Sequence, residues 1–202
     1  MSRPDYIGEI KKRIASEKVG AAFVAADFVD ITDKSVVNTA LTRLASEGCV
    51  RRVLRGVYDK PGYNDFLKEY IAPVPDNVAH AIARNYGWTI VPCGDTALNL
   101  LGLSAQVPAA WVYVSDGMYK KYAFGNTVIQ FRRTANKEIS KLSYKTALTI
   151  QALKALGKDN ADESAIENLR KFLTDEEKAA MLREAKSATS WIYEYIREIC
   201  GS

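Results

Sequence analysis

The stretch KSVVNTALTRLASEGCVRRVLRGVYDKP, residues 34–61, decides the fold of the first part of this chain. Its first half has apolar residues at helical spacing, and these are Val37, Ala40, Leu41 and Leu44. The spacing predicts an amphipathic helix over residues 33–47 that Gly48 ends. The runs over residues 49–53 and 54–58 are rich in valine and arginine, which predicts two short strands. The stretch is therefore expected to form a helix followed directly by a basic β-ribbon.

Two further helices are predicted upstream of this stretch. Residues 5–18 have an apolar stripe of isoleucines at i, i+3 and i+7, and residues 21–31, AAFVAADFVDI, have the size and pattern of a short second helix. Three short helices followed by a hairpin is the order of a winged helix-turn-helix. We therefore expect residues 1–62 to form a domain of this kind.

The polar residues of the predicted helix and ribbon suit DNA. Small hydroxyls, amides and arginines donate hydrogen bonds to base edges and phosphates without bulk. The candidate DNA-binding residues are Lys34, Ser35, Asn38, Thr39, Thr42, Arg43, Arg51, Arg52 and Arg55. A solvated helix face beside an edge hairpin protected by its arginines would contain the same residue types. The direct succession of helix and basic ribbon favours double-stranded DNA as the ligand.

The rest of the chain predicts a second domain. Residues 63–75 follow Pro61-Gly62, are rich in proline and aromatic residues, and are expected to be a linker that packs on a domain. Within residues 76–202 the pattern predicts helices, short strands and then a helical C-terminal tail, with the domain boundary near residue 75. The expected fold class is α+β: a winged helix followed by a small mixed α/β domain.

Charge and composition restrict the function classes. The net charge is +4 in 202 residues, and no run of apolar residues approaches the length of a membrane span or a signal-peptide core. We therefore expect a cytoplasmic protein without a membrane partner. The cysteines, Cys49, Cys93 and Cys200, lie far apart, which indicates neither a disulfide framework nor a zinc site. The only histidine, His80, is interpreted as a structural or surface residue.

An enzyme is the first alternative. Gly94-Asp95-Thr96 at a predicted helix start could hold an anion on backbone N–H groups, but the sequence contains neither a P-loop nor a GxGxxG motif. Asp95 is interpreted as an N-cap, and the carboxylates of this domain do not cluster as a metal site requires. We therefore expect no catalytic residue, no metal and no cofactor. An enzyme that acts on nucleotides or phosphorylated groups is kept as the competing hypothesis.

The second domain also contains basic residues interleaved with aromatic ones. The residues of this possible second basic surface are Lys120, Lys121, Arg132, Arg133 and Lys137. Basic side chains among Tyr119, Tyr122 and Phe124 could contact nucleic acid. An ordinary solvated face would have the same composition.

Two segments resemble those of a known family. RLASEGCVRRVLRGVYDKP, residues 43–61, and GDTALNLLGLSAQVPAAWVYVS, residues 94–115, look like the signature regions of AbiEi-type antitoxins, and the resemblance extends to about residue 157. It implies an antitoxin of a type IV toxin-antitoxin system, a class associated with phage defence, encoded beside a nucleotidyltransferase-like toxin. In such proteins the winged helix represses the operon, and the C-terminal domain counters toxicity, typically without a stable complex with the toxin.

By position, the resemblance assigns DNA contacts to the following residues: Ser35, Asn38, Thr42, Arg43, Arg51, Arg52 and Arg55. A third hypothesis is an interaction module that uses its C-terminal helices to bind the toxin or itself. The operator sequence, the oligomeric state and the role of the helices after about residue 158 stay open.

Overall fold

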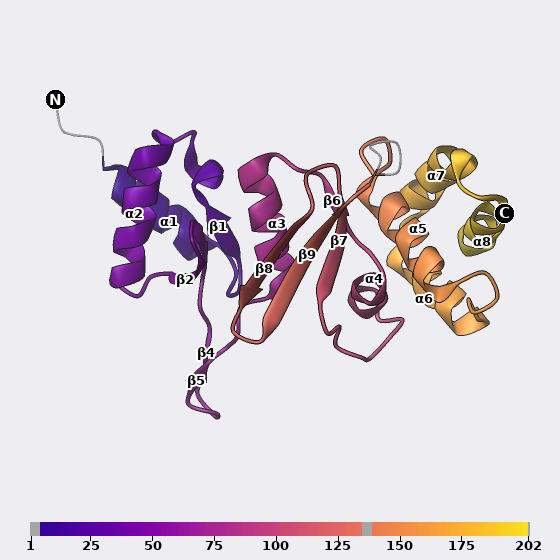
Figure 1. The fold of residues 1–202 in the computed structure, drawn as a ribbon, viewed down its shortest axis with the longest axis horizontal. Helices are drawn as coiled ribbons and strands as arrows, with labels where there is room; N and C mark the ends of the chain where they lie inside the picture. Colours follow the sequence, from indigo (N-terminus) through magenta and orange to yellow (C-terminus); the bar gives the residue numbers. More distant parts are fainter. Residues whose placement is uncertain (1–4, 135–138, 202) are drawn as a thin grey trace. The chain divides into compact units, whose positions relative to one another are not determined.

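The computed structural model describes residues 5–134 and 139–201 (Figure 1). The fold is α+β, as predicted. The chain divides into two compact units, one that ends at Trp88 and one that begins at Thr89. In the described ranges, no helix is both long and apolar enough to cross a bilayer.

The first unit contains the arrangement of a winged helix. Its elements are α1 (Tyr6–Ser16), β1 (Ala22–Val24), the 3₁₀ helix η1 (Ala25–Phe28), α2 (Lys34–Ser46), β2 (Arg51–Leu54) and β3 (Val57–Asp59). The strands form an antiparallel sheet in the order β1-β3-β2. The core lies between this sheet and the helices, and its largest fully buried side chains are Ile10, Phe28, Leu41 and Leu44. The predicted helix over residues 33–47 is confirmed as α2.

The prediction of a helix over residues 21–31 is wrong, because these residues form β1 and η1. Phe23 lies opposite Tyr58 of β3, so β1 completes the sheet through long-range pairing that local periodicity does not reveal. The carboxylate of Asp27 then accepts a hydrogen bond from the backbone N–H of Val24 at 2.9 Å. This contact turns the chain out of the strand and into the short 3₁₀ helix.

Residues 63–75, the predicted packed linker, contain a small hairpin of β4 (Tyr63–Asn64) and β5 (Glu69–Tyr70). Its base is closed by a hydrogen bond from the N–H of Ile71 to the carbonyl of Gly62, and Arg51 of β2 holds it by donating to the carbonyl of Ile71. Its tip is exposed, and Phe66 at the turn is 92% accessible to solvent. The stretch is therefore a projecting hairpin with an anchored base.

Helix α3 (Pro75–Tyr86) belongs to the first unit, so the predicted boundary at residue 75 is replaced by one after Trp88. Its apolar face, which includes Val78, Ala79 and Ile82, is buried, and the helix packs on β1, η1 and β3. Asn77 donates to the carbonyl of Gly20 at 2.8 Å. The proline-rich composition before α3 therefore marks the start of a helix within the first unit.

The second unit is built on a four-stranded sheet. Its strands are β6 (Ile90–Pro92), β7 (Trp111–Ser115), β8 (Lys120–Phe124) and β9 (Thr127–Arg133), in the order β6-β7-β9-β8. Strands β7 and β9 are parallel, and the other pairs are antiparallel. Strand β8 was not predicted, because its two lysines and two aromatic residues were interpreted as part of a basic surface. The short helix α4 (Asp95–Leu100) packs on β7.

The C-terminal helices pack around α5 (Tyr144–Leu156). These helices are α6 (Glu163–Phe172), α7 (Asp175–Glu184), the 3₁₀ helix η3 (Ala185–Ser187) and α8 (Ser190–Cys200). Residues 146–153 of α5 are all buried, because the helix contacts α4 and β6 as well as α7 and α8. A helix that is buried all round shows little amphipathic pattern. The predicted helical tail is thus part of the core of the second unit (Figure 1).

Glu184 at the end of α7 fixes the start of α5. Its carboxylate accepts hydrogen bonds from the N–H of Ser143 at 2.9 Å and from the Ser143 hydroxyl at 2.8 Å. Burial raises the pKa of Glu184, but these hydrogen bonds outweigh it and the net pKa lies below the ordinary value. The carboxylate contributes stability above its unfolded-state pKa, and this contribution is lost as the pH falls through the lower folded-state pKa.

We predict that Glu184→Gln lowers the free energy of unfolding by about 1 kcal/mol at neutral pH. The difference from the wild type should shrink as the pH falls through the lowered folded-state pKa of Glu184, because protonation removes the charge that Gln lacks. Chemical denaturation at several pH values measures this difference. A deficit that stays constant down to acid pH would contradict the role of the charged carboxylate.

Candidate nucleic-acid interface

The face of α2 opposite the core is polar and exposed. The buried residues are Val37, Ala40, Leu41 and Leu44, as the spacing predicted. The predicted DNA-binding residues of this helix are all exposed: Lys34, Ser35, Asn38, Thr39, Thr42 and Arg43. At 100° per residue, Ser35, Thr39 and Thr42 lie closest to the direction that points away from the core. These small side chains allow the helix backbone to approach a flat or grooved partner closely.

Hydrogen bonds within the unit fix part of this face. The Thr39 hydroxyl donates to the carbonyl of Ser35 at 3.1 Å, and the Thr42 hydroxyl to that of Asn38 at 2.8 Å. The Thr42 hydroxyl also lies 3.2 Å from the Tyr58 hydroxyl of β3. This contact joins α2 to the hairpin of β2 and β3, residues 51–59, which we call the wing. It therefore fixes the spacing between α2 and the wing.

Arg43 lies near the end of α2 in an ion pair. Its Nε donates to Glu47 at 2.9 Å, and Lys11 of α1 lies 3.7 Å from the same carboxylate. The hydrogen bond from Arg43 lowers the pKa of Glu47, with a smaller effect of Lys11. All three side chains are at least one-third exposed, so the pair is weak and Arg43 can exchange it for a phosphate.

Arg52 and Arg55 are the exposed arginines of the wing. In the described part of the chain neither has an ion pair or a side-chain hydrogen bond, and the turn between the strands places Gly56 at φ 77°. Arg52 lies opposite Tyr58 in the sheet, so it projects on the side of the sheet that faces α2. The strand pairing therefore places Arg52 on the same side of this sheet as α2.

Arg51 has a structural role that its prediction as a DNA contact did not include. Its Nε and Nη2 donate to the two carboxylate oxygens of Asp59, at 3.0 and 2.5 Å, and Nη1 donates to the carbonyl of Ile71 at 2.9 Å. Asp59 is 1% exposed. Arg51 therefore neutralises a buried carboxylate and holds the base of the β4–β5 hairpin. The sequence signal that could have shown this role is Asp59, the acidic residue that lies opposite Arg51 in the predicted ribbon.

The residues predicted as a second basic surface do not share one face. Lys121 lies opposite Gln130, whereas Lys120 lies opposite the buried Phe131. Because side chains alternate along β9, Lys121 and Arg132 project on one side, and Lys120 and Arg133 on the other. Lys137 lies outside the described residues. The sheet thus divides the cluster into two pairs.

Gly94-Asp95-Thr96 is occupied by internal contacts. Gly94 is the N-cap at φ 58°, and Asp95 is the first helical residue, so the prediction of Asp95 as N-cap is wrong by one position. The hydroxyl of Thr96 is fully buried and accepts the N–H of Val112 at 2.7 Å. Its role is to tie α4 to β7.

Potential metal ligands and the cysteines give no further site. In residues 5–134 and 139–201, no three His, Cys, Asp or Glu side chains cluster as metal ligands. All three cysteines are free thiols, and burial raises the pKa of Cys93 and Cys200. Raised pKa values keep these two thiols protonated and poorly nucleophilic at neutral pH.

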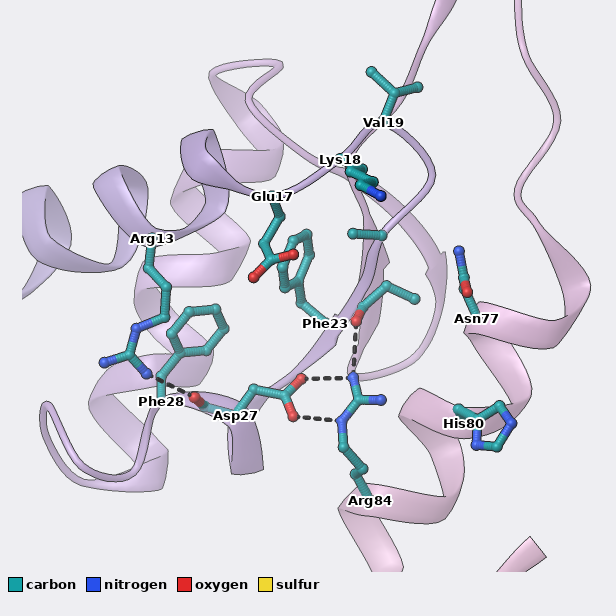
Figure 2. A pocket seen from close by; sticks show the side chains of 12 residues that line it. Arg13, Glu17, Lys18, Val19, Phe23, Asp27, Phe28, Asn77, His80 and Arg84 are labelled. Carbon is teal, nitrogen blue, oxygen red and sulfur yellow. Dashed lines mark hydrogen bonds and ion pairs between the residues drawn. The ribbon is translucent and has the colours of Figure 1, made fainter. Parts of the chain in front are cut away.

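A pocket in the first unit was not predicted from the sequence. It has a volume of about 610 Å³ and lies among α1, β1, η1 and α3 (Figure 2). His80 is one of its lining residues, and burial lowers the pKa of this side chain, so the imidazole is neutral at pH 7. The pocket joins segments about 60 positions apart in sequence, for instance Asp27 and Arg84, which is why local patterns did not reveal it.

The two neighbouring arginines of β2 give a matched test. We predict that Arg51→Ala destabilises the first unit by roughly 3 kcal/mol, because it leaves the Asp59 carboxylate buried without its partner. Arg52→Ala should change stability by no more than about 0.5 kcal/mol. Hydrogen exchange of the β3 amides in the full chain measures both. Equal losses in the two variants would show that Arg51 has no special structural role.

Comparisons with known proteins give a family and no function. No curated protein matches the chain. A family model described as a family of unknown function, DUF6088, matches residues 9–181, which include most of both units. The chain therefore belongs to the DUF6088 family.

Proposed function

We propose that this protein is a DNA-binding antitoxin of the type IV class. It binds the promoter of its own operon as an autorepressor in the cytoplasm, and it counters a nucleotidyltransferase-like toxin. The observation that most supports DNA binding is the exposed polar face of α2 together with the exposed arginines of the wing, Arg52 and Arg55. A helix of this kind enters the major groove, and wing arginines reach the adjacent backbone or minor groove.

The contacts divide into two kinds. Arg52, Arg55 and Lys34 are suited to phosphates, which supply affinity but no sequence information. Ser35 and Asn38 are suited to base edges, because their side chains are exposed and an asparagine amide can pair with adenine in the major groove. The fixed spacing between α2 and β3, set at the Thr42 and Tyr58 hydroxyls, lets both kinds of contact form together.

The antitoxin part of the proposal depends on the resemblance to AbiEi-type proteins over residues 43–61 and 94–115. The second of these segments runs from Gly94 through α4 to the end of β7, in the unit that begins at Thr89. Repression and antitoxicity are therefore assigned to different units. Whether neutralisation includes direct binding of the toxin is decided by experiment.

The DNA proposal is tested by titrating the protein with its own promoter at about 50 and 200 mM salt. We predict that the double variant Arg52→Ala/Arg55→Ala binds more weakly and that its salt dependence falls by roughly two counterions. The control is Arg183→Ala/Arg197→Ala, which removes the same charge from two exposed arginines of the second unit. Promoter binding unchanged in the wing variant would overturn the proposed interface.

Sequence recognition has a separate prediction. Asn38→Ala should reduce the preference for promoter DNA over unrelated DNA by about 1–3 kcal/mol, because it removes a base contact and leaves the phosphate contacts in place. Binding to unrelated DNA should stay near the wild-type value. A uniform weakening on both DNAs would instead place Asn38 among the phosphate contacts.

Co-expression with the product of the neighbouring gene tests the antitoxin function. The wing double variant should lose repression of the operon but still rescue growth, because antitoxicity is assigned to the second unit. Failure of the wild type to rescue growth would overturn the antitoxin proposal. Light scattering on the mixed proteins separates the mechanisms, since a stable complex would support the interaction-module hypothesis in place of neutralisation without binding.

A further inference from the structure

The pocket of the first unit has charged groups that the fold does not use. Most of its ionic groups are paired: Arg84 donates to both carboxylate oxygens of Asp27, at 2.7 and 3.1 Å, and Arg13 is paired with Asp30. The side chains of Glu17 and Lys18 are different. They are adjacent in sequence and exposed at the pocket, and in the described residues neither side chain has an ion pair or a hydrogen bond.

The opposite wall supplies further groups from α3. Figure 2 shows Glu17 and Lys18 on one side of the pocket and the α3 side chains of Asn77, His80 and Arg84 on the other. Asn77 uses its amide nitrogen on the carbonyl of Gly20, which leaves its oxygen as an acceptor. Arg84 uses Nε and Nη2 on Asp27 and the carbonyl of Ala22, which leaves Nη1 as a donor.

We infer that this pocket binds a small zwitterion with the charges of an α-amino acid. The ligand ammonium would pair with the carboxylate of Glu17, and its carboxylate with the ammonium of Lys18. Its side chain would extend across the pocket towards Asn77 and Nη1 of Arg84. The volume of about 610 Å³ is within the range of small-molecule sites, and Val19 and Ala21 provide apolar surface for a side chain.

The two free charges explain the choice of ligand class. A simple anion would meet the carboxylate of Glu17, and a simple cation would meet the ammonium of Lys18. The neutral imidazole of His80 adds no charge of either sign. A molecule with both charges satisfies both groups, and each charge-assisted hydrogen bond is roughly twice as strong as a neutral one.

A chain of contacts connects the pocket to the start of α2. Arg84 forms an ion pair with the carboxylate of Asp27, and the backbone carbonyl of Asp27 accepts a hydrogen bond from Arg13 at 3.0 Å. Arg13 in turn pairs with Asp30, which lies just before α2. A ligand on Arg84 can therefore bias the turn from which α2 begins. The resulting change in promoter affinity rests on the proposed function, whereas ligand binding itself does not.

Calorimetry on the full chain without DNA tests the site. The probes are the twenty L-amino acids. For each amino acid there are two analogues: an amine that lacks the carboxylate and an acid that lacks the ammonium. At least one amino acid should bind, and its two singly charged analogues should bind about tenfold more weakly. Absence of binding by all twenty at about 10 mM, or equal binding of an analogue, would overturn the inference.

Variants connect any binding to the named groups. Glu17→Gln and Lys18→Gln should each lower the affinity for the amino acid about tenfold. Lys12→Gln is the matched control, because Lys12 is an exposed lysine of α1 that does not line the pocket. If the control weakens binding as much as Lys18→Gln, the site lies elsewhere and the inference fails.

A promoter titration with and without the bound amino acid then measures the coupling. A changed promoter affinity would support the connection through Arg13 and Asp30, and an unchanged affinity would overturn that connection. If the protein bound no promoter at all, the proposed function would fail while the calorimetric result still stood. The two failures are therefore distinguishable.

Discussion

The first unit depends on one carboxylate, that of Asp27. Its oxygens accept hydrogen bonds from Val24 and from two nitrogens of Arg84, and its backbone carbonyl accepts Arg13. Strand β1, helix η1, helix α3 and helix α1 thus meet at a single residue. Because Asp27 is only 19% exposed at its side chain, its charge requires these partners. The position of α3 in the first unit follows from this requirement as much as from its apolar face.

A second constraint decides which basic residues can meet a ligand. Side chains alternate along a strand, so Arg51 and Arg52 project on opposite sides of the sheet although they are neighbours in sequence. Arg51 forms an ion pair with the buried Asp59, whereas Arg52 is exposed on the side of the sheet that faces α2. The same alternation separates Lys120 from Lys121. A count of charges in sequence therefore overestimates the surface available to DNA.

The helices could be predicted well because their signals are local. The apolar stripes of α1 and α2 both depend on residues within a few positions of one another. The exposed DNA-binding candidates on α2 followed from the same periodicity. The sequence could not show β1, because its pairing partner lies in β3. Strand β8 was missed for a similar reason: it is a strand because it pairs with β9, and this pairing has no local signal.

The remaining differences come from contacts between distant residues. The boundary after Trp88 depends on α3 packing against β1, and the pocket depends on the same packing. The structural role of Arg51 depends on a buried partner, Asp59, whose burial has no signal in the sequence. For the boundary and the pocket, the deciding contact joins residues that are far apart in the sequence, so local patterns could not show it.

The order of the second sheet, β6-β7-β9-β8, leaves two outer strands whose backbone groups could pair with another chain. One outer strand is three residues long and ends in Pro92, which lacks the N–H that a further strand would need. The other begins with Lys120 and Lys121, and lysines on an outer strand disfavour the approach of a second, equally charged copy. The lysine pair therefore has a use that requires no ligand: it keeps the sheet from growing from one molecule into the next.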